Sequence, residues 1–102
     1  MAEKIDLTVN DVPIKLDYFV SRFVDHTFCG MVESLEGTGK VHNLLLTIEG
    51  GKLAIKLDGL DIPVNKFVTK IFISTAGGIL APLKGVSLPV QKMRLAIVKY
   101  SP

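Results

Sequence analysis

Residues 5–16 read IDLTVNDVPIKL, and residues 53–64, which stand 48 positions further along, read LAIKLDGLDIPV. In both stretches apolar residues alternate on either side of a two-residue break, Asn10-Asp11 in the first and Asp58-Gly59 in the second. Alternation is typical of half-buried strands, and Asp-Gly is a strong signal for a two-residue hairpin turn. Each stretch therefore predicts a β-hairpin, and its recurrence indicates an internal repeat.

The chain matches itself well beyond these hairpins. A shift of 48 residues aligns residues 7–37 with 55–85 without a gap, and seven of the 31 aligned pairs are identical. Random pairing at ordinary residue frequencies would give about two identities. The match resumes after one inserted residue. We interpret the 102 residues as one domain made of two repeats, about 5–49 and 53–99.

The hairpin register places a proline in both second strands. If the two turns are equivalent, Pro13 lies opposite Thr8 and Pro63 lies opposite Ala54. Proline has no N–H to donate to a neighbouring strand, so within sheets it is tolerated at an edge. Both second strands are therefore predicted to be sheet edges.

A helix is predicted after each hairpin. Asp17 and Asn65, at equivalent positions, suit helix N-caps, because their side-chain oxygens accept N–H groups of the first turn. Gly37 and Gly85 suit the left-handed residue that ends a helix, and Pro82 is expected to kink or end the second helix. The apolar positions shared by both copies form a broad stripe on one side of each helix, which we expect to be core: 19/67, 20/68, 23/71, 24/72, 28/76, 31/79, 32/80 and 35/83.

Strands near residues 41–49 and 90–99 complete each copy. The predicted fold is α+β: a duplicated β-β-α-β unit with two helices on one face of a mostly antiparallel sheet. Gly30 and Gly78, near the middle of the two helices, predict close packing of helix on helix or helix on sheet. The strand order stays open. Glu49-Gly50-Gly51 favours pairing of the third and fourth strands, pseudo-symmetry favours the third beside the sixth, and a swapped dimer would allow both.

Function is expected where the two copies differ, and the second helix differs most from an ordinary amphipathic helix. It runs from Ile71 to Leu83, 13 residues, without a charge, which is too short for a bilayer span of about 20 residues. A helix that is apolar all round is usually covered on both sides. The cover could be the chain itself, a homodimer or protein partner, or a membrane surface or apolar ligand. We favour a homodimer or partner interface formed by Lys70, Ile73, Ser74, Gly77 and Ala81.

The charge distribution supports self-association. Residues 1–51 hold four Lys/Arg and eight Asp/Glu, a net charge of −4, whereas residues 52–102 hold eight and two, a net charge of +6. Opposite net charges favour apposition of the two halves, within one chain or between two. Nucleic acid is not predicted as a partner, because there is no tryptophan and no basic strand with interleaved aromatic residues.

One polar cluster on the first helix has enzymatic potential. Residues spaced three or four apart share one helix face, and a cation beside a cysteine lowers its pKa, as a thiol nucleophile requires. A single cysteine is more often a small buried apolar residue, and the few potential ligands do not predict a metal site. The cluster consists of Arg22, His26, Cys29 and Glu33.

A glycine-rich segment also invites a functional interpretation. Residues 37–40, GTGK, contain the glycine and lysine of a phosphate-binding loop. A phosphate loop leads from a strand into a helix, whereas this segment follows a helix and leads into a strand. We therefore predict no nucleotide and no other cofactor.

Residues 58–68, DGLDIPVNKFV, and 30–37, GMVESLEG, carry a pattern that resembles small uncharacterised bacterial proteins: a polar-Gly turn, an Ile-Pro-x-Asn step, Phe-Val and a Gly-Met-Val-x-Ser-Leu-x-Gly helix end. The first copy departs from it with Lys15 and Asp17, and the second with Ala81-Pro82. The resemblance implies no activity, because none is attached to that family.

Composition bounds the remaining possibilities. At 48% hydrophobic and 22% charged residues the chain is expected to form a packed core, and its one cysteine excludes an intrachain disulfide. The first four residues, MAEK, have no apolar signal-peptide core, so a cytoplasmic location is expected. We expect a small binding or accessory protein rather than an enzyme. The alternatives are a carrier of a small apolar ligand between helices and sheet, and a thiol-dependent enzyme.

Overall fold

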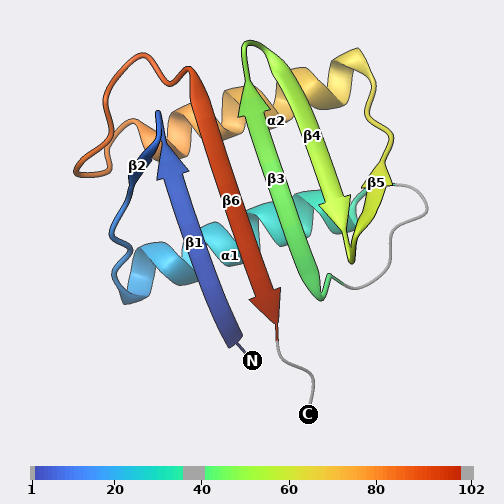
Figure 1. Ribbon diagram of the computed structural model, residues 1–102, viewed down its shortest axis with the longest axis horizontal. Helices are drawn as coiled ribbons and strands as arrows, with labels where there is room; N and C mark the ends of the chain where they lie inside the picture. The colour runs from blue at the N-terminus through green and yellow to red at the C-terminus, as the bar shows by residue number, and fades with distance from the viewer. Residues whose placement is uncertain (1, 36–40, 100–102) are drawn as a thin grey trace.

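The computed structural model describes residues 2–35 and 41–99. Within these ranges the order β-β-α-β occurs twice (Figure 1). The elements are β1 (Ala2–Val9), β2 (Val12–Pro13), α1 (Tyr18–Glu33), β3 (Asn43–Glu49), β4 (Lys52–Leu57), β5 (Leu60–Ile62), α2 (Lys66–Leu80) and β6 (Lys92–Lys99).

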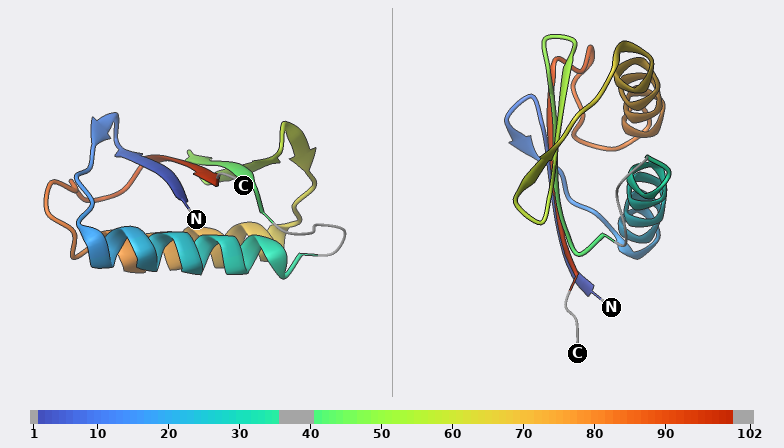
Figure 2. Two further views of the ribbon diagram at one scale, coloured as in Figure 1. Left: turned by 90° about the horizontal axis from the view of Figure 1, so that it is seen from below. Right: turned by 90° about the vertical axis from the view of Figure 1, so that its right-hand side faces the viewer.

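The strands form a single antiparallel sheet in the order β2-β1-β6-β3-β4-β5. Both helices cover the same face of this sheet, side by side and running in opposite directions (Figures 1 and 2). The predicted α+β fold is confirmed. Whether the two halves arose by duplication is not tested by their common element order, and it stays a prediction.

The topology resolves the strand order that the sequence left open. β3 lies between β4 and β6, so both expected neighbours are present within one chain. The tight turn that joins β3 to β4 is made by Gly50 and Gly51, both at positive φ. In consequence the last strand of each half pairs with the first strand of the other half: β3 with β4, and β6 with β1.

The hairpin register is confirmed where strands are formed. Thr8 faces Pro13 and Ile55 faces Ile62, and the short strands β2 and β5 are the two edges of the sheet. Asn10, at φ 51°, is a turn residue of the first hairpin, and such a turn needs residues that tolerate the left-handed region. The edge positions predicted from the prolines are therefore correct.

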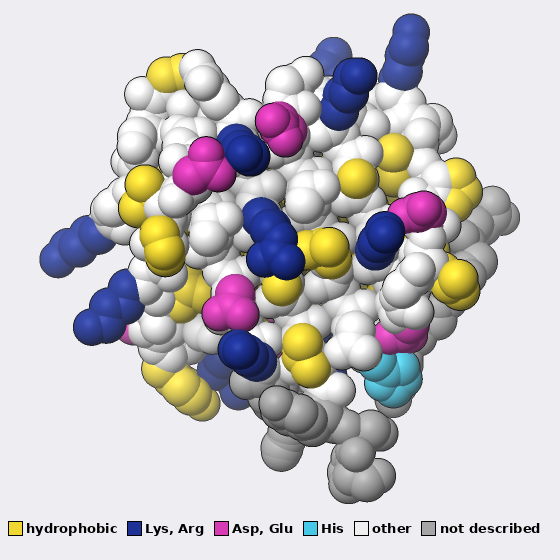
Figure 3. All heavy atoms as spheres, viewed as in Figure 1, with side chains coloured by type: hydrophobic (Ala, Val, Ile, Leu, Met, Phe, Trp, Pro, Cys, Tyr) yellow, Lys and Arg dark blue, Asp and Glu magenta, His cyan; other side chains and the backbone are white. Residues whose placement is uncertain are grey.

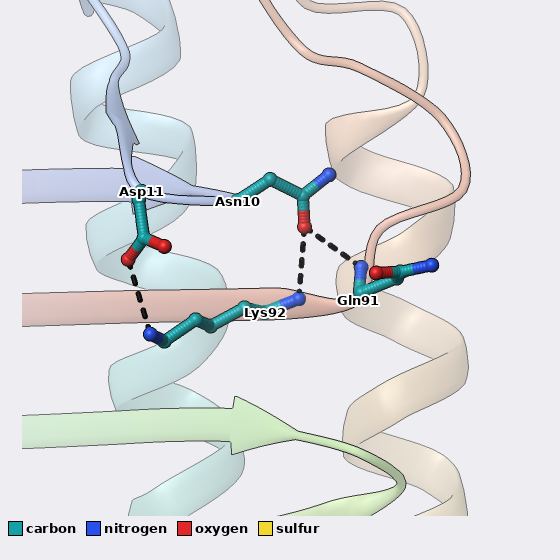
Figure 4. Close-up of polar contacts among 4 residues, drawn as sticks. All are labelled: Asn10, Asp11, Gln91 and Lys92. Carbon is teal, nitrogen blue, oxygen red and sulfur yellow. Dashed lines mark hydrogen bonds and ion pairs between the residues drawn. The ribbon is translucent and has the colours of Figure 1, made fainter.

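The two hairpin turns also hold the halves together. The Asn10 side-chain oxygen accepts hydrogen bonds from the backbone N–H groups of Gln91, at 2.9 Å, and Lys92, at 3.0 Å (Figure 4). In the second hairpin, Asp58 accepts from the N–H of Asn43 at 2.9 Å. Each turn thus fixes the start of the other half's last strand, β6 or β3.

Helix starts are as predicted, and the helix ends are as predicted only in part. The side chains of Asp17 and Asn65 cap α1 and α2 by accepting from the third N–H beyond them, each at 2.8 Å. α2 ends at Leu80, directly before Ala81 and Pro82, so Pro82 ends it as expected. Gly85 has φ 86° but lies beyond that end, so its predicted role as the helix terminator is wrong. Gly37 lies outside the described residues.

The core lies between the sheet and a narrow strip of each helix. The helices contribute residues spaced four apart, Val24, Phe28 and Val32 in α1 and Phe72, Ala76 and Leu80 in α2, and the central strands contribute every second residue. The helix stripe predicted from the sequence was too broad, because a sheet covers only one side of a helix and each residue advances about 100° around the axis. Four positions assigned to the core are exposed instead: Phe19, Phe23, Phe67 and Ile71.

Candidate protein-interaction surface

Exposed residues form one continuous row along the outer side of each helix. They recur at alternating intervals of four and three residues, the spacing that keeps side chains in line along a helix that packs against another helix. We call the two rows together the outer stripe. Its members are Phe19, Phe23, His26, Gly30 and Glu33 in the first half and Phe67, Ile71, Ser74, Gly78 and Ala81 in the second.

The outer stripe is bulky at its N-terminal end in both halves and has a glycine, Gly30 or Gly78, one position before its C-terminal member. Phe19 is 71% exposed and Phe67 is 69% exposed. The rings of Phe19 and Phe23 stack with their centroids 5.9 Å apart. A Cβ atom built at Gly30 or Gly78 would meet nothing within 4 Å, so the close packing predicted at these glycines is wrong and both face open space.

The residues of the interface predicted on α2 differ in exposure, and the interface itself stays a prediction. Lys70, Ser74 and Ala81 are exposed, and the last two belong to the outer stripe. Ile73 is half-buried and packs against the core, and Gly77 is half-buried as well. The sequence interpretation does not include the large members of the stripe, because apolar residues on a helix ordinarily indicate burial. The signal available was their four-three spacing on the side opposite to the buried row.

The polar cluster predicted on α1 is brought together only in part: Arg22 and His26 line the same surface hollow beside α1. The Arg22 guanidinium lies 5.5 Å above the Tyr18 ring, and His26 is exposed. The Glu33 carboxylate accepts from the backbone N–H of Val41 at 3.2 Å. Cys29 is buried and donates a hydrogen bond to Asp25, one turn earlier in the same helix. A site that uses all four residues stays a prediction.

The surroundings of Cys29 disfavour a thiolate. The thiol donates a hydrogen bond to the Asp25 carboxylate at 3.2 Å, and Lys99 pairs with the same carboxylate oxygen at 3.2 Å. Burial, followed by the Asp25 hydrogen bond, raises the pKa of Cys29 to about 12. A nucleophilic thiol needs the opposite shift. The cation beside the thiol is Lys99, whereas the sequence suggested Arg22 or His26.

Two surface hollows lie at equivalent places, one beside the start of each helix. The hollow beside α2, of about 620 Å³, is lined by Lys52, Lys66 and Lys70 among others. The hollow beside α1, of about 350 Å³, has Asp25 and Arg22 in its lining. The described part of the chain contains no group of three or more His, Cys, Asp or Glu residues that could hold a metal ion. The hollows differ in charge, in the sense expected from the net charges of the two halves.

The opposite face of the molecule has a different character. On the sheet face turned away from the helices, Lys, Arg, Asp and Glu side chains are interspersed (Figure 3). Lys92 and Asp11 form an ion pair at 3.1 Å, and the Asp11 carboxylate raises the pKa of Lys92. Mixed charges of this kind are ordinary for a solvated surface. The helix side, rather than the sheet side, is therefore the candidate interaction surface.

Comparisons with known proteins give no relative that bears on the function of this chain. No family model, no curated protein and no solved structure matches the chain significantly. Within the residues described, neither helix is long and apolar enough to cross a membrane.

Proposed function

We propose that this protein is a non-catalytic interaction module that binds another protein surface through its outer stripe. The observation that supports the proposal is the exposure of four large apolar side chains in one layer: Phe19, Phe23, Phe67 and Ile71. Burial of such a side chain contributes about 1.5–3 kcal/mol. Clustered exposed apolar residues mark interaction sites far more often than scattered ones do.

The other functions considered from the sequence have less support. The raised pKa of Cys29 argues against a thiol-dependent enzyme. A carrier of a small apolar ligand would need space between helices and sheet, where Phe28 and Phe72 are already packed at 1% and 2% exposure. Native mass spectrometry that finds an apolar ligand bound to the purified protein would favour the carrier instead.

The test is a double substitution, Phe19→Ser with Phe67→Ser, which removes one large side chain from each end of the layer. Leu60→Ser is the matched control, because Leu60 is 70% exposed but lies on the edge strand β5. Light scattering gives the mass of each variant against the chain mass of 11.1 kDa, at low and at high salt. Tagged protein gives its bound partners by affinity purification.

We expect the wild type to be found in an assembly, either with itself or with another protein. The double variant should lose this assembly, and Leu60→Ser should keep it. Circular dichroism of both variants shows whether they are folded. Assembly that survives in the folded double variant, or a wild type found in no assembly by either method, would overturn the proposal.

A further inference from the structure

We infer that the surface bound by the outer stripe is the outer stripe of a second copy of this chain, so that two helix layers pack face to face between two outer sheets. The inference rests on the proposed function and names its partner. The partner is indicated by shape, by the course of the helices and by charge.

The outer stripe is complementary to itself in shape. Each of its rows has a phenylalanine at its N-terminal end and, 11 residues or about three helical turns later, a glycine where a side chain would meet open space. When two such rows run antiparallel, the second large residue of one row lies over the glycine of the other. Phe23 of one copy then lies over Gly78 of the second copy, and Ile71 over Gly30 of the second copy. Large side chains packed over small ones fill an interface without voids.

The course of the helices allows this pairing for every row at once. α1 and α2 run side by side in opposite directions on one face of the sheet (Figures 1 and 2). A two-fold axis between the layers and parallel to the helices places α1 over α2 of the second copy, antiparallel to it. The same contact occurs twice, as a two-fold interface requires. An axis perpendicular to the helices would instead place α1 over α1 and α2 over α2.

Charge decides between the two arrangements. α1 carries Asp25, Glu33 and Arg22, whereas α2 carries Lys66 and Lys70 and no acidic residue. The halves that contain them have net charges of −4 and +6. With α1 over α2, Glu33 lies at the end of the layer where Lys66 and Lys70 of the second copy lie. With like helices paired, α2 would lie over α2, and these lysines would have no acidic residue of the second copy opposite them, which is less favourable.

The experiment uses single cysteine substitutions at the midpoints of the two rows. Pairing α1 with α2 puts position 26 opposite position 74 of the second copy. Pairing like helices puts 26 opposite 26 and 74 opposite 74. Both His26 and Ser74 are exposed, so His26→Cys and Ser74→Cys should not disturb the core. Wild-type protein controls for the native Cys29, which is buried.

Each variant is treated with a short bismaleimide alone and after subunit exchange in a mixture of the two. We expect covalent dimers in the mixture, and none in either variant alone or in the wild type. Cross-linking of each variant to itself would overturn the arrangement but leave the outer stripe as the interface. Monomeric wild-type protein at high concentration would overturn the second copy as partner. In that case the proposed function would still hold if Phe19 and Phe67 were required for assembly with another protein, and it would fail if they were not.

Discussion

At the residue scale, Cys29 shows how burial and one hydrogen bond set the chemistry of a side chain. Its thiol is 4% exposed and donates to Asp25, and its pKa is about 12 against an ordinary value of 9.0. The folded state therefore holds the proton more tightly than the unfolded state does. The resulting stabilisation is complete below pH 9 and is lost progressively as the pH rises from 9 toward 12.

The first prediction follows from this difference in pKa. Between pH 8 and pH 10 the wild type should lose about 1 kcal/mol more unfolding free energy than Cys29→Ala does. Urea unfolding at each pH measures the two slopes. The comparison with Cys29→Ala removes the contributions of groups that do not contact Cys29 and so are common to both proteins. Parallel slopes would mean that the Cys29 thiol ionises in the folded protein as easily as in the unfolded one.

Asn10 is the second residue whose role is defined by its contacts. Besides accepting from Gln91 and Lys92, its side-chain amide donates to the carbonyls of Ser87 and Pro89, each at 3.2 Å. Asn10→Gly keeps the positive φ but removes these bonds. We expect it to lower the unfolding free energy by about 2–4 kcal/mol, since each bond contributes about 0.5–1.5.

Asp11→Gly is the matched control for Asn10→Gly. Asp11 has the same kind of backbone, at φ 66°, but only an exposed ion pair to Lys92. Its replacement should change the stability by less than about 1 kcal/mol. Chemical denaturation of the two variants gives both values. Equal effects would show that the turn itself, rather than the Asn10 side chain, holds the two halves.

At the element scale, α2 shows that two neighbouring isoleucines of the same charge-free run have opposite roles. Ile73 is half-buried and packs against the core, whereas Ile71 is 40% exposed and belongs to the outer stripe. Ile73→Lys is therefore expected to lower the unfolding free energy by about 2–4 kcal/mol. This reverses the expectation from the sequence, which placed Ile73 in the interface.

Ile71→Lys, by contrast, should leave the stability of the monomer within about 1 kcal/mol of the wild type and abolish self-association. Urea unfolding at low protein concentration separates the two effects, and light scattering measures association. If Ile71→Lys destabilises the fold as much as Ile73→Lys does, Ile71 is covered by the chain itself and the outer stripe is not an interaction surface.

The elements differ in how well the sequence predicted them. Hairpin turns, edge strands and N-caps were predicted correctly because single residues determine them locally: Asp58-Gly59 for a turn, Pro13 for an edge, Asp17 for a cap. Burial of Phe19 and Phe67 was predicted wrongly because it depends on what covers the helix, which is a tertiary property. Hydropathy alone does not distinguish an apolar side chain in the core from one that is exposed at the surface.

At the scale of the whole molecule, the two halves are interlocked rather than adjacent. β1 pairs with β6, and β3 lies between β6 and β4, so the long strands of each half find their long partners in the other half. The sequence contained both signals, the Gly50-Gly51 turn and the repeat, but not the means to combine them. A strand can pair along both of its edges, and β3 pairs with β4 along one edge and with β6 along the other.

This interlocking predicts how the molecule behaves when it is divided at the Gly50-Gly51 turn. Residues 1–50 would keep β1 and β3 but lack β6, the strand that lies between them in the sheet. We expect each fragment alone, when monomeric, to show no cooperative thermal transition, because an isolated hairpin with a helix buries too little apolar surface.

An equimolar mixture of the two fragments should regain the β-sheet and helix signals in circular dichroism and unfold cooperatively. A variant fragment with Asn10→Gly should complement more weakly than one with Asp11→Gly. If residues 1–50 fold alone as a monomer, the pairing between halves is not what stabilises the sheet. If they fold only as a homodimer, a second copy of the fragment takes the place of the missing half. That result is the one expected if the chain descends from a duplicated dimeric unit.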